Sequence, residues 1–241
     1  MSRQALLALQ QALVEDLTAA HHLGGTARGP ETRLAGYDAE RVALLARLTQ
    51  SKRLGKIARV LPATFALLGP AVPALFPDFV EAHALRSANG YWNAVQFYRF
   101  LRRRQRRGLL APAPAADLAA CELAMASAAR NSRSVARWPA RGGVAIRRAA
   151  GSVLRTCAYD VRALLGAWQV APPAAPVRRV HVGVAADAET GKAVVLELEP
   201  AAFALVRRLR QWQAVERAVV DDTASGALLR RLVAVGLLDV R

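Results

Sequence analysis

Cysteine is scarce in this chain of 241 residues, which contains two, Cys121 and Cys157. Both stand among apolar residues, and they are too far apart to form a Cys-x-x-Cys motif. A disulfide framework therefore has little support, and we expect two buried free thiols. Such thiols are typical of a reducing compartment. Residues 1–20 also lack the basic-then-apolar order of a secretory signal, so the sequence predicts a cytoplasmic protein.

Residues that usually carry catalysis are also few, and none stands in a known catalytic spacing. The chain has four histidines and contains no HExxH, no GxSxG and no glycine-rich phosphate loop. Glu81 and His83 lie two positions apart, and His21 and His22 are adjacent, so neither pair shares a helix face that could hold a metal ion. We predict a binding protein with no catalytic, cofactor-binding or metal-binding residue. A small enzyme with an unrecognised site is the alternative left open.

Lysine accounts for three of the 34 basic residues, and arginine for the rest. The formal net charge is +16 and is unevenly distributed. Residues 102–155 hold twelve Arg against two acidic residues, whereas residues 176–241 hold ten Lys or Arg against eight acidic residues. The basic middle could attract nucleic acid, an acidic peptide or an acidic protein face. The abundance of Arg, Ala, Val and Leu is partly a compositional bias, which weakens the nucleic-acid interpretation.

One uncharged run, Val60 to Pro77, is 18 residues long, about the minimum for a membrane span. Four prolines interrupt it, and Gly69 precedes the second of them. Prolines break helices, so the run predicts two short helices with a turn near Gly69 to Pro73 rather than a membrane span.

The sequence predicts an α+β fold in three parts. Residues 1–110 form an all-helical domain, with a first helix over 1–23 and a second one capped by Asp38 that packs through Val42, Leu44, Leu45 and Leu48. Further helices are expected over 54–61, 64–68, 72–84 and 91–101. Residues 111–176 form a connector with helices near 117–130 and 161–168 and strands near 144–148 and 154–159.

Residues 177–241 read as a compact terminal domain. A hairpin pairs a strand around Val180–Val184 with a strand over Lys192–Leu198, across a turn at 187–191. A helix begins at Pro200, and a last helix runs from Asp222-Thr223 to Gly236. Leu237 to Val240 returns as a short third strand. This order predicts a winged-helix-like, peptide-recognition-element-like domain.

Two surfaces are candidates for binding. A strand with free N–H and C=O groups can accept an extended peptide as an added strand, and the last helix would flank it. His181 alternates with valines and is expected to face solvent or a partner. The predicted peptide-binding residues are Val180, His181, Val182, Gly183, Val184, Leu228, Arg231 and Leu232.

The second surface is the aromatic stretch that precedes the arginine run at 102–107. Aromatic rings beside arginines could stack bases or contact a partner protein. Trp92, Phe97 and Phe100 stand at helical spacing and are also typical of core residues. We predict a partner interface at Tyr91, Trp92, Tyr98, Arg102 and Arg103.

Short motifs along most of the chain carry a family resemblance. They are Tyr37-Asp38, Leu61-Pro62-Ala63-Thr64, Leu67-Leu68-Gly69, Phe76-Pro77-Asp78-Phe79, Ala158-Tyr159-Asp160-Val161, Leu198-Glu199-Pro200-Ala201 and Gly236-Leu237-Leu238. In this order, the motifs resemble DUF2063-like proteins, the MbnC- and TglI-like partners of DUF692-type multinuclear non-haem iron oxidative enzymes.

The resemblance implies a role in the biosynthesis of ribosomally made, modified peptides. Such a partner forms a heterodimer with the iron enzyme, and its C-terminal domain receives the leader of the precursor peptide by strand addition. The iron ligands lie on the enzyme, so no cofactor is expected on this chain. A winged-helix DNA-binding regulator is the alternative function, although Asp221, Asp222 and the near-neutral terminal domain argue against it.

Overall fold

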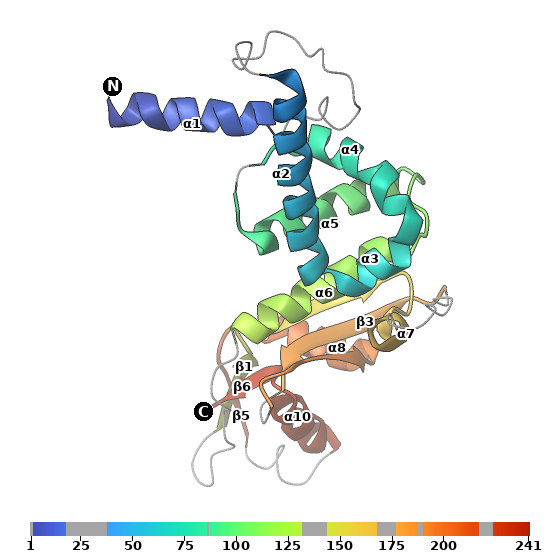
Figure 1. Ribbon diagram of the computed structural model, residues 1–241. Coiled ribbons are helices and arrows are strands. Elements are labelled where there is room, and N and C mark those ends of the chain that lie inside the picture. Colours follow the sequence, from blue (N-terminus) through green and yellow to red (C-terminus); the bar gives the residue numbers. More distant parts are fainter. Residues whose placement is uncertain are drawn as a thin grey trace. The chain divides into compact units, whose positions relative to one another are not determined.

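The computed structural model describes residues 2–17, 38–85, 87–131, 144–167, 177–187, 190–216 and 224–241. The chain divides into two compact units, Met1–Ala116 and Asp117–Arg241. Every element described within the first unit is helical, and the second combines helices with two small antiparallel sheets (Figure 1). The α+β class predicted from the sequence is confirmed. His21, His22 and Tyr37 lie outside the described residues.

The helices of the first unit follow one another along the chain. They are α1 (Arg3–Leu17), α2 (Ala39–Val60), α3 (Pro62–Leu68), the 3-10 turn η2 (Gly69–Ala71), α4 (Val72–Ala82) and α5 (Gly90–Arg106). Asp38 caps α2 as predicted, because its Oδ1 accepts hydrogen bonds from the backbone N–H groups of Glu40 (2.9 Å) and Arg41 (3.4 Å). The two helices predicted over 38–61 are a single helix of 22 residues.

The predicted apolar face of α2 was wrong at its three leucines and right at Val42. Leu44, Leu45 and Leu48 are about half exposed, and the opposite face carries the buried residues Val42, Ala46, Gln50, Arg53 and Ile57. Two of these five residues are polar, so the buried face does not show the apolar periodicity of an amphipathic helix. Arg53 donates from Nε to Asn93 Oδ1 (3.0 Å), and its guanidinium lies 4.6 Å from the ring centre of Phe79. Burial lowers the pKa of Arg53 to about 10.

The apolar run folds as the prolines predict. Among the described residues, Pro62–Ala82 is the one stretch long and apolar enough to cross a membrane. The structure breaks it at Gly69–Ala71 and buries Leu68, Phe76 and Phe79 in the helical core, where Phe79 meets Phe97 edge-on at 5.1 Å. Core helices of soluble proteins pass the same length and composition test, so the stretch is weak evidence for a membrane span.

The second unit holds α6, which begins at the boundary between the units, and two three-stranded sheets. One sheet has the order β2-β3-β4 and the other β5-β1-β6. Its elements are α6 (Ala115–Arg130), β1 (Val144–Arg148), β2 (Val153–Cys157), α7 (Arg162–Ala167), β3 (Val180–Ala186), β4 (Ala193–Leu198), α8 (Pro200–Arg208), β5 (Gln213–Val215), α10 (Ala224–Ala234) and β6 (Leu238–Val240).

The predicted hairpin is present as β3 and β4. Its strands pair in antiparallel register from His181 with Leu198 to Ala186 with Ala193. The turn is held by Asp187, whose Oδ1 accepts a hydrogen bond from Thr190 N–H (2.8 Å), and by Gly191 at φ +66°.

The structure draws the domain boundary differently from the sequence. The predicted connector, 111–176, supplies β2, which pairs with β3 along its whole length, and β1, which pairs with β5 and β6. Residues 117–241 are therefore one compact unit rather than a connector and a separate terminal domain. The predicted return strand exists as β6, but it pairs with β1 and not with the hairpin. Strand partners of this kind are set by contacts distant in sequence, which local patterns do not reveal.

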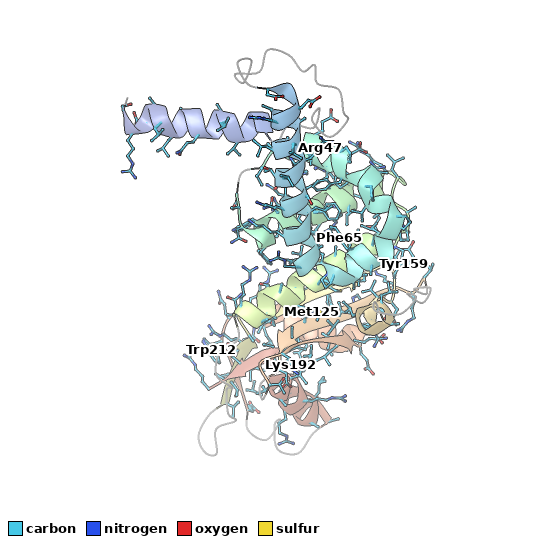
Figure 2. The ribbon with its side chains drawn as sticks, in the orientation of Figure 1. Arg47, Phe65, Met125, Tyr159, Lys192 and Trp212 are labelled. Carbon is cyan, nitrogen blue, oxygen red and sulfur yellow. The ribbon has the colours of Figure 1, made fainter. Side chains whose placement is uncertain are left out.

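Helices cover both faces of the β2-β3-β4 sheet. Ala124 and Ala128 of α6 pack against Val184 on one face. The helices α8 and α10 lie on the other side of this sheet (Figure 1). There a larger core joins the sheet, α8, α10 and the β5-β1-β6 sheet. Trp212, labelled in Figure 2, precedes the edge strand β5, and the guanidinium groups of Arg147 and Arg241 lie 4.6 and 4.4 Å from its ring centre.

Two glycines allow this close packing. A Cβ on Gly183 would lie 2.9 Å from Leu237 Cδ2 and 3.0 Å from Leu198 Cδ1. Gly236 ends α10 at φ +73°, and a Cβ there would lie 2.3 Å from the carbonyl oxygen of Ala186. The end of α10 is therefore tied to the end of β3 by a contact that no larger residue permits.

Candidate peptide-binding groove

The strand predicted to receive a peptide, β3, is the central strand of its sheet. It pairs with β2 on one side and with β4 on the other, so it has no edge to offer an added strand. Val180, Val182 and Val184 are no more than 2% exposed, and Gly183 is buried as well. The prediction that these four residues contact a peptide was therefore wrong. Its error was to treat a two-stranded hairpin as the whole sheet.

His181, which was expected to face solvent or a partner, is half-buried and packs within the protein. Its ring stacks on Phe203 of α8 with centres 4.4 Å apart, and its Nδ1 lies 3.0 Å from the Thr156 hydroxyl of β2. The alternation with valines correctly placed it on the other face of β3, but α8 covers that face. His181 thus acts as a packing residue between β2, β3 and α8.

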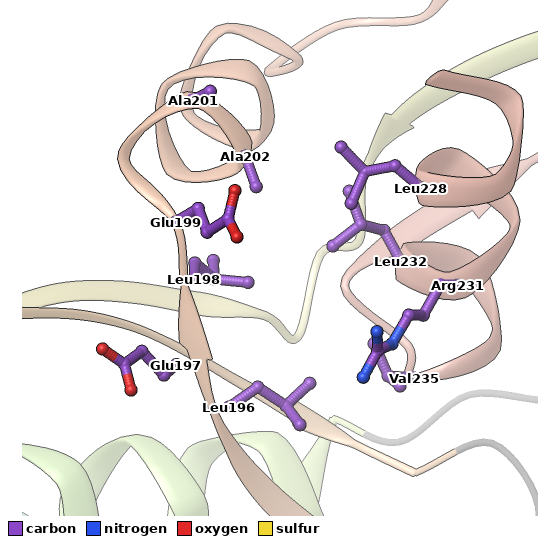
Figure 3. Close-up of a pocket in the computed structure, with 10 residues that line it drawn as sticks. All are labelled: Leu196, Glu197, Leu198, Glu199, Ala201, Ala202, Leu228, Arg231, Leu232 and Val235. Atoms are coloured by element: carbon purple, nitrogen blue, oxygen red, sulfur yellow. The ribbon is translucent and has the colours of Figure 1, made fainter. Parts of the chain in front are cut away.

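The neighbouring strand β4 has an unpaired side. It is the last strand in the order β2-β3-β4, and no strand pairs with its outer edge in the part of the chain that the structure describes. Beside that edge lies a groove of about 330 Å³ between β4, the start of α8 and one face of α10 (Figure 3). The residues that line this β4–α10 groove are Leu196, Glu197, Leu198, Glu199, Ala201, Ala202, Leu228, Arg231, Leu232 and Val235.

The walls of the groove are mainly apolar. Leu196 and Leu198 come from alternate positions of β4, and Leu228 and Leu232 come from successive turns of α10 (Figure 3). Leu228, Arg231 and Leu232 are the three residues of the predicted peptide-binding set that the structure brings together here. The β4 residues were missed, although the alternation of Leu196 and Leu198 in the sequence could have indicated them.

Two charged side chains, those of Glu199 and Arg231, lie at the groove. The carboxylate of Glu199 points into the groove beside Ala202, and the guanidinium of Arg231 lies near Val235 at the level of Leu196 (Figure 3). Both side chains belong to exposed residues. The groove therefore joins an apolar slot, a free strand edge and one charge of each sign.

The side chain of Glu197 points away from α10 (Figure 3) and joins a ring of ion pairs. It contacts Arg162 at 2.6 Å and Arg178 at 2.8 Å, and both arginines also contact Asp160, at 2.7 and 2.5 Å. Hydrogen bonds from Arg162 and Arg178 hold the pKa of the Asp160 carboxyl well below its usual range. A hydrogen bond from Arg178 also lowers the pKa of Glu197. The ring ties β4 to α7 and to the start of β3.

The second predicted surface lies on α5 in the helical unit, and the name α5 surface is used for Tyr91, Trp92, Tyr98, Arg102 and Arg103. Trp92 is 58% exposed, so its interpretation as a core residue was wrong, whereas Phe97 and Phe100 are buried as expected. Arg102 donates to the Tyr98 hydroxyl (2.8 Å), and Arg103 contacts His83.

A stripe of arginines continues the α5 surface. Arg99, Arg102, Arg103 and Arg106 are exposed and follow the spacing i, i+3, i+4, i+7 of a single helix face. Within the described residues none of the four forms an ion pair, whereas the neighbouring Arg104 contacts Asp78 at 2.7 Å. Burial and the charge of Arg103 lower the pKa of His83. This face thus presents concentrated, unneutralised positive charge.

The described residues contain no group of three or more His, Cys, Asp or Glu side chains placed to hold a metal ion. Cys121 and Cys157 are free and buried, with their sulfur atoms 4.0 Å apart. Contact with the Cys157 thiol and burial raise the pKa of Cys121. A protonated buried thiol is a poor nucleophile and a poor ligand.

Comparison of the sequence with models of protein families and with curated proteins finds no match. The family resemblance therefore stays a prediction.

Proposed function

We propose that this chain is a non-catalytic recognition subunit that binds an extended peptide along the outer edge of β4, inside the β4–α10 groove. The observation that supports this most is the free edge of β4 beside an apolar slot. Backbone pairing along such an edge supplies affinity for any extended chain, and side-chain pockets for alternate residues supply selectivity. This proposal replaces the predicted site on β3, and it keeps the predicted role of α10 as the flanking helix.

The family resemblance suggests the cargo and the partner. The peptide would be the leader of a ribosomally made precursor, and the partner a DUF692-type iron enzyme that modifies it in the cytoplasm. The α5 surface is then the candidate docking face for the enzyme, because its unpaired arginines favour an acidic protein face. The iron would be held by the enzyme.

The experiment uses the full chain and short overlapping peptides that cover the precursor encoded beside it. Fluorescence anisotropy of labelled peptides gives the dissociation constants. The variant Leu228→Lys places a charge on the apolar wall and should weaken leader binding by about tenfold or more. Ala234→Lys adds the same charge to an exposed position of α10 that does not line the groove, and it should bind as the unchanged protein does.

Two results would contradict the proposal. One is equal loss of binding in both lysine variants, which would indicate a charge effect without a groove. The other is a chain that binds neither any leader peptide nor the neighbouring enzyme in co-purification. Tight binding to random duplex DNA with a steep salt dependence would favour the winged-helix regulator instead.

A further inference from the structure

The two charges at the β4–α10 groove stand at different levels along β4. Arg231 reaches the level of Leu196, and Glu199 follows the last residue of the strand (Figure 3). Three residues separate these levels, a distance of about 10 Å at the rise of a β-strand. Among the described residues neither side chain forms an ion pair, in contrast to Glu197, which two arginines hold. Both charges are therefore available to a ligand.

The apolar surface lies between these charges. Leu198 of β4 and Leu232 of α10 face each other there, and both are buried, so they form the base of the slot. A peptide strand beside β4 would turn every second side chain toward α10. One apolar side chain would enter the slot. The residues two positions before and after it would lie about 13 Å apart along the peptide, and the length of Lys, Arg and Glu side chains allows them to reach the two charges.

The direction of the peptide follows from the pairing that this protein uses. All four strand pairs in the described residues are antiparallel, and antiparallel ladders are slightly more stable per residue than parallel ones. An antiparallel peptide would enter beside Glu199 and leave beside Arg231. Its first inward-facing residue would then meet a carboxylate and its last one a guanidinium.

We propose that the groove selects peptides by the order of their charges, in the pattern basic-x-apolar-x-acidic, read from the N-terminus. This inference rests on the proposed function, since it assigns the sequence class of the peptide that the groove would bind. The pattern has no net charge, so the arginine-rich remainder of the chain does not attract it. Recognition of this kind would distinguish the bound peptide from acidic ligands, which a strongly basic protein binds without specificity.

The test compares two labelled peptides of identical composition, one containing Lys-Thr-Leu-Thr-Glu and the other Glu-Thr-Leu-Thr-Lys, with the same threonine-rich flanks. Both have the same net charge and the same propensity to form a strand. At roughly physiological salt, where exposed ion pairs are weak but measurable, the first should bind about tenfold tighter to the full chain. The double variant Glu199→Lys with Arg231→Glu should reverse that preference.

The control variant is Arg207→Glu, an exposed position on α8 that does not line the groove and should leave the preference unchanged. Circular dichroism and thermal unfolding check that each variant is folded. Equal binding of both peptides would overturn the inference on charge order and leave the groove in place. Tighter binding of the peptide that begins with Glu would overturn the antiparallel arrangement. If neither peptide nor any leader peptide binds, the groove itself is not the site, and the proposed function fails.

Discussion

The α5 surface and the β4–α10 groove differ in how they could hold a partner. The α5 surface lies on one face of a helix, with an exposed Trp92 and, together with the stripe that continues it, four arginines that form no ion pair among the described residues. The groove is concave and apolar, with a free strand edge and a single charge of each sign. Interactions of the first kind weaken steeply with salt, whereas backbone pairing and apolar burial do not. The two surfaces should therefore respond to different perturbations.

The largest expected effect comes from a substitution at Gly236, which should disrupt the β4–α10 groove. The change Gly236→Ala forces a Cβ to within 2.3 Å of a backbone oxygen at φ +73°, and it should lower the free energy of unfolding by about 3 kcal/mol or more. Peptide binding should be lost with it. Denaturant unfolding measures the stability, and peptide anisotropy measures the binding.

The matched control is Gly191→Ala in the β3–β4 turn. Gly191 also has positive φ, at +66°, but a Cβ there meets nothing within 4 Å. Only the backbone strain applies, at about 1 kcal/mol. Equal destabilisation by the two changes would show that the contact between α10 and β3 contributes nothing.

An intermediate effect is expected from changes to the α5 surface. The double change Arg102→Glu with Arg103→Glu reverses two charges of the α5 surface and should weaken binding of the proposed enzyme partner by about tenfold or more. Peptide affinity should stay the same. Isothermal titration at two salt concentrations measures both, and raising the salt should weaken enzyme binding much more than peptide binding. A loss of peptide binding in this variant would contradict the division between the surfaces.

A smaller effect concerns the ring of ion pairs that Asp160, Arg162, Arg178 and Glu197 form. Removing the Asp160 charge in Asp160→Asn leaves Arg162 and Arg178 with Glu197 alone, and should destabilise the protein by about 1 kcal/mol at neutral pH. The folded state lowers the pKa of Asp160, so its contribution is complete above the unfolded pKa and is lost as the pH falls through the folded pKa.

The stability difference between the unchanged protein and Asp160→Asn should therefore be constant near neutral pH and shrink below about pH 4. Thermal unfolding across this pH range measures it. A difference that grows on acidification would show that the ring does not stabilise the folded chain.

Local signals predicted much of the fold. The cap at Asp38, the proline-marked turn near Gly69, the β3–β4 turn and the helix that begins at Pro200 are all present, because each depends on neighbours within a few residues. Long-range pairings were not predictable in this way. The sequence near Leu154 does not indicate that its strand, β2, pairs with β3. Because of this pairing, the edge available to a peptide is on β4 and not on β3.

The candidate site was predicted in part for the same reason. The last helix does line the groove, because the spacing of Leu228 and Leu232 places them on one face, whereas its role in peptide binding stays a prediction. His181 was misplaced, because strand alternation gives the face of a side chain but not the element that covers it. The exposed leucines of α2 were predicted to be buried. The face that is buried contains Gln50 and Arg53, so it has no apolar periodicity to indicate it.

Hydrogen–deuterium exchange with a bound leader peptide tests the central claim most directly. If the peptide adds a strand to the free edge, the exchange rates of outward-facing amides within Ala193–Leu198 should fall by about tenfold or more. The exchange rates at the outer edge of β2 and on the α5 surface should not change. Protection confined to β2 or to α5, with none on β4, would contradict the account.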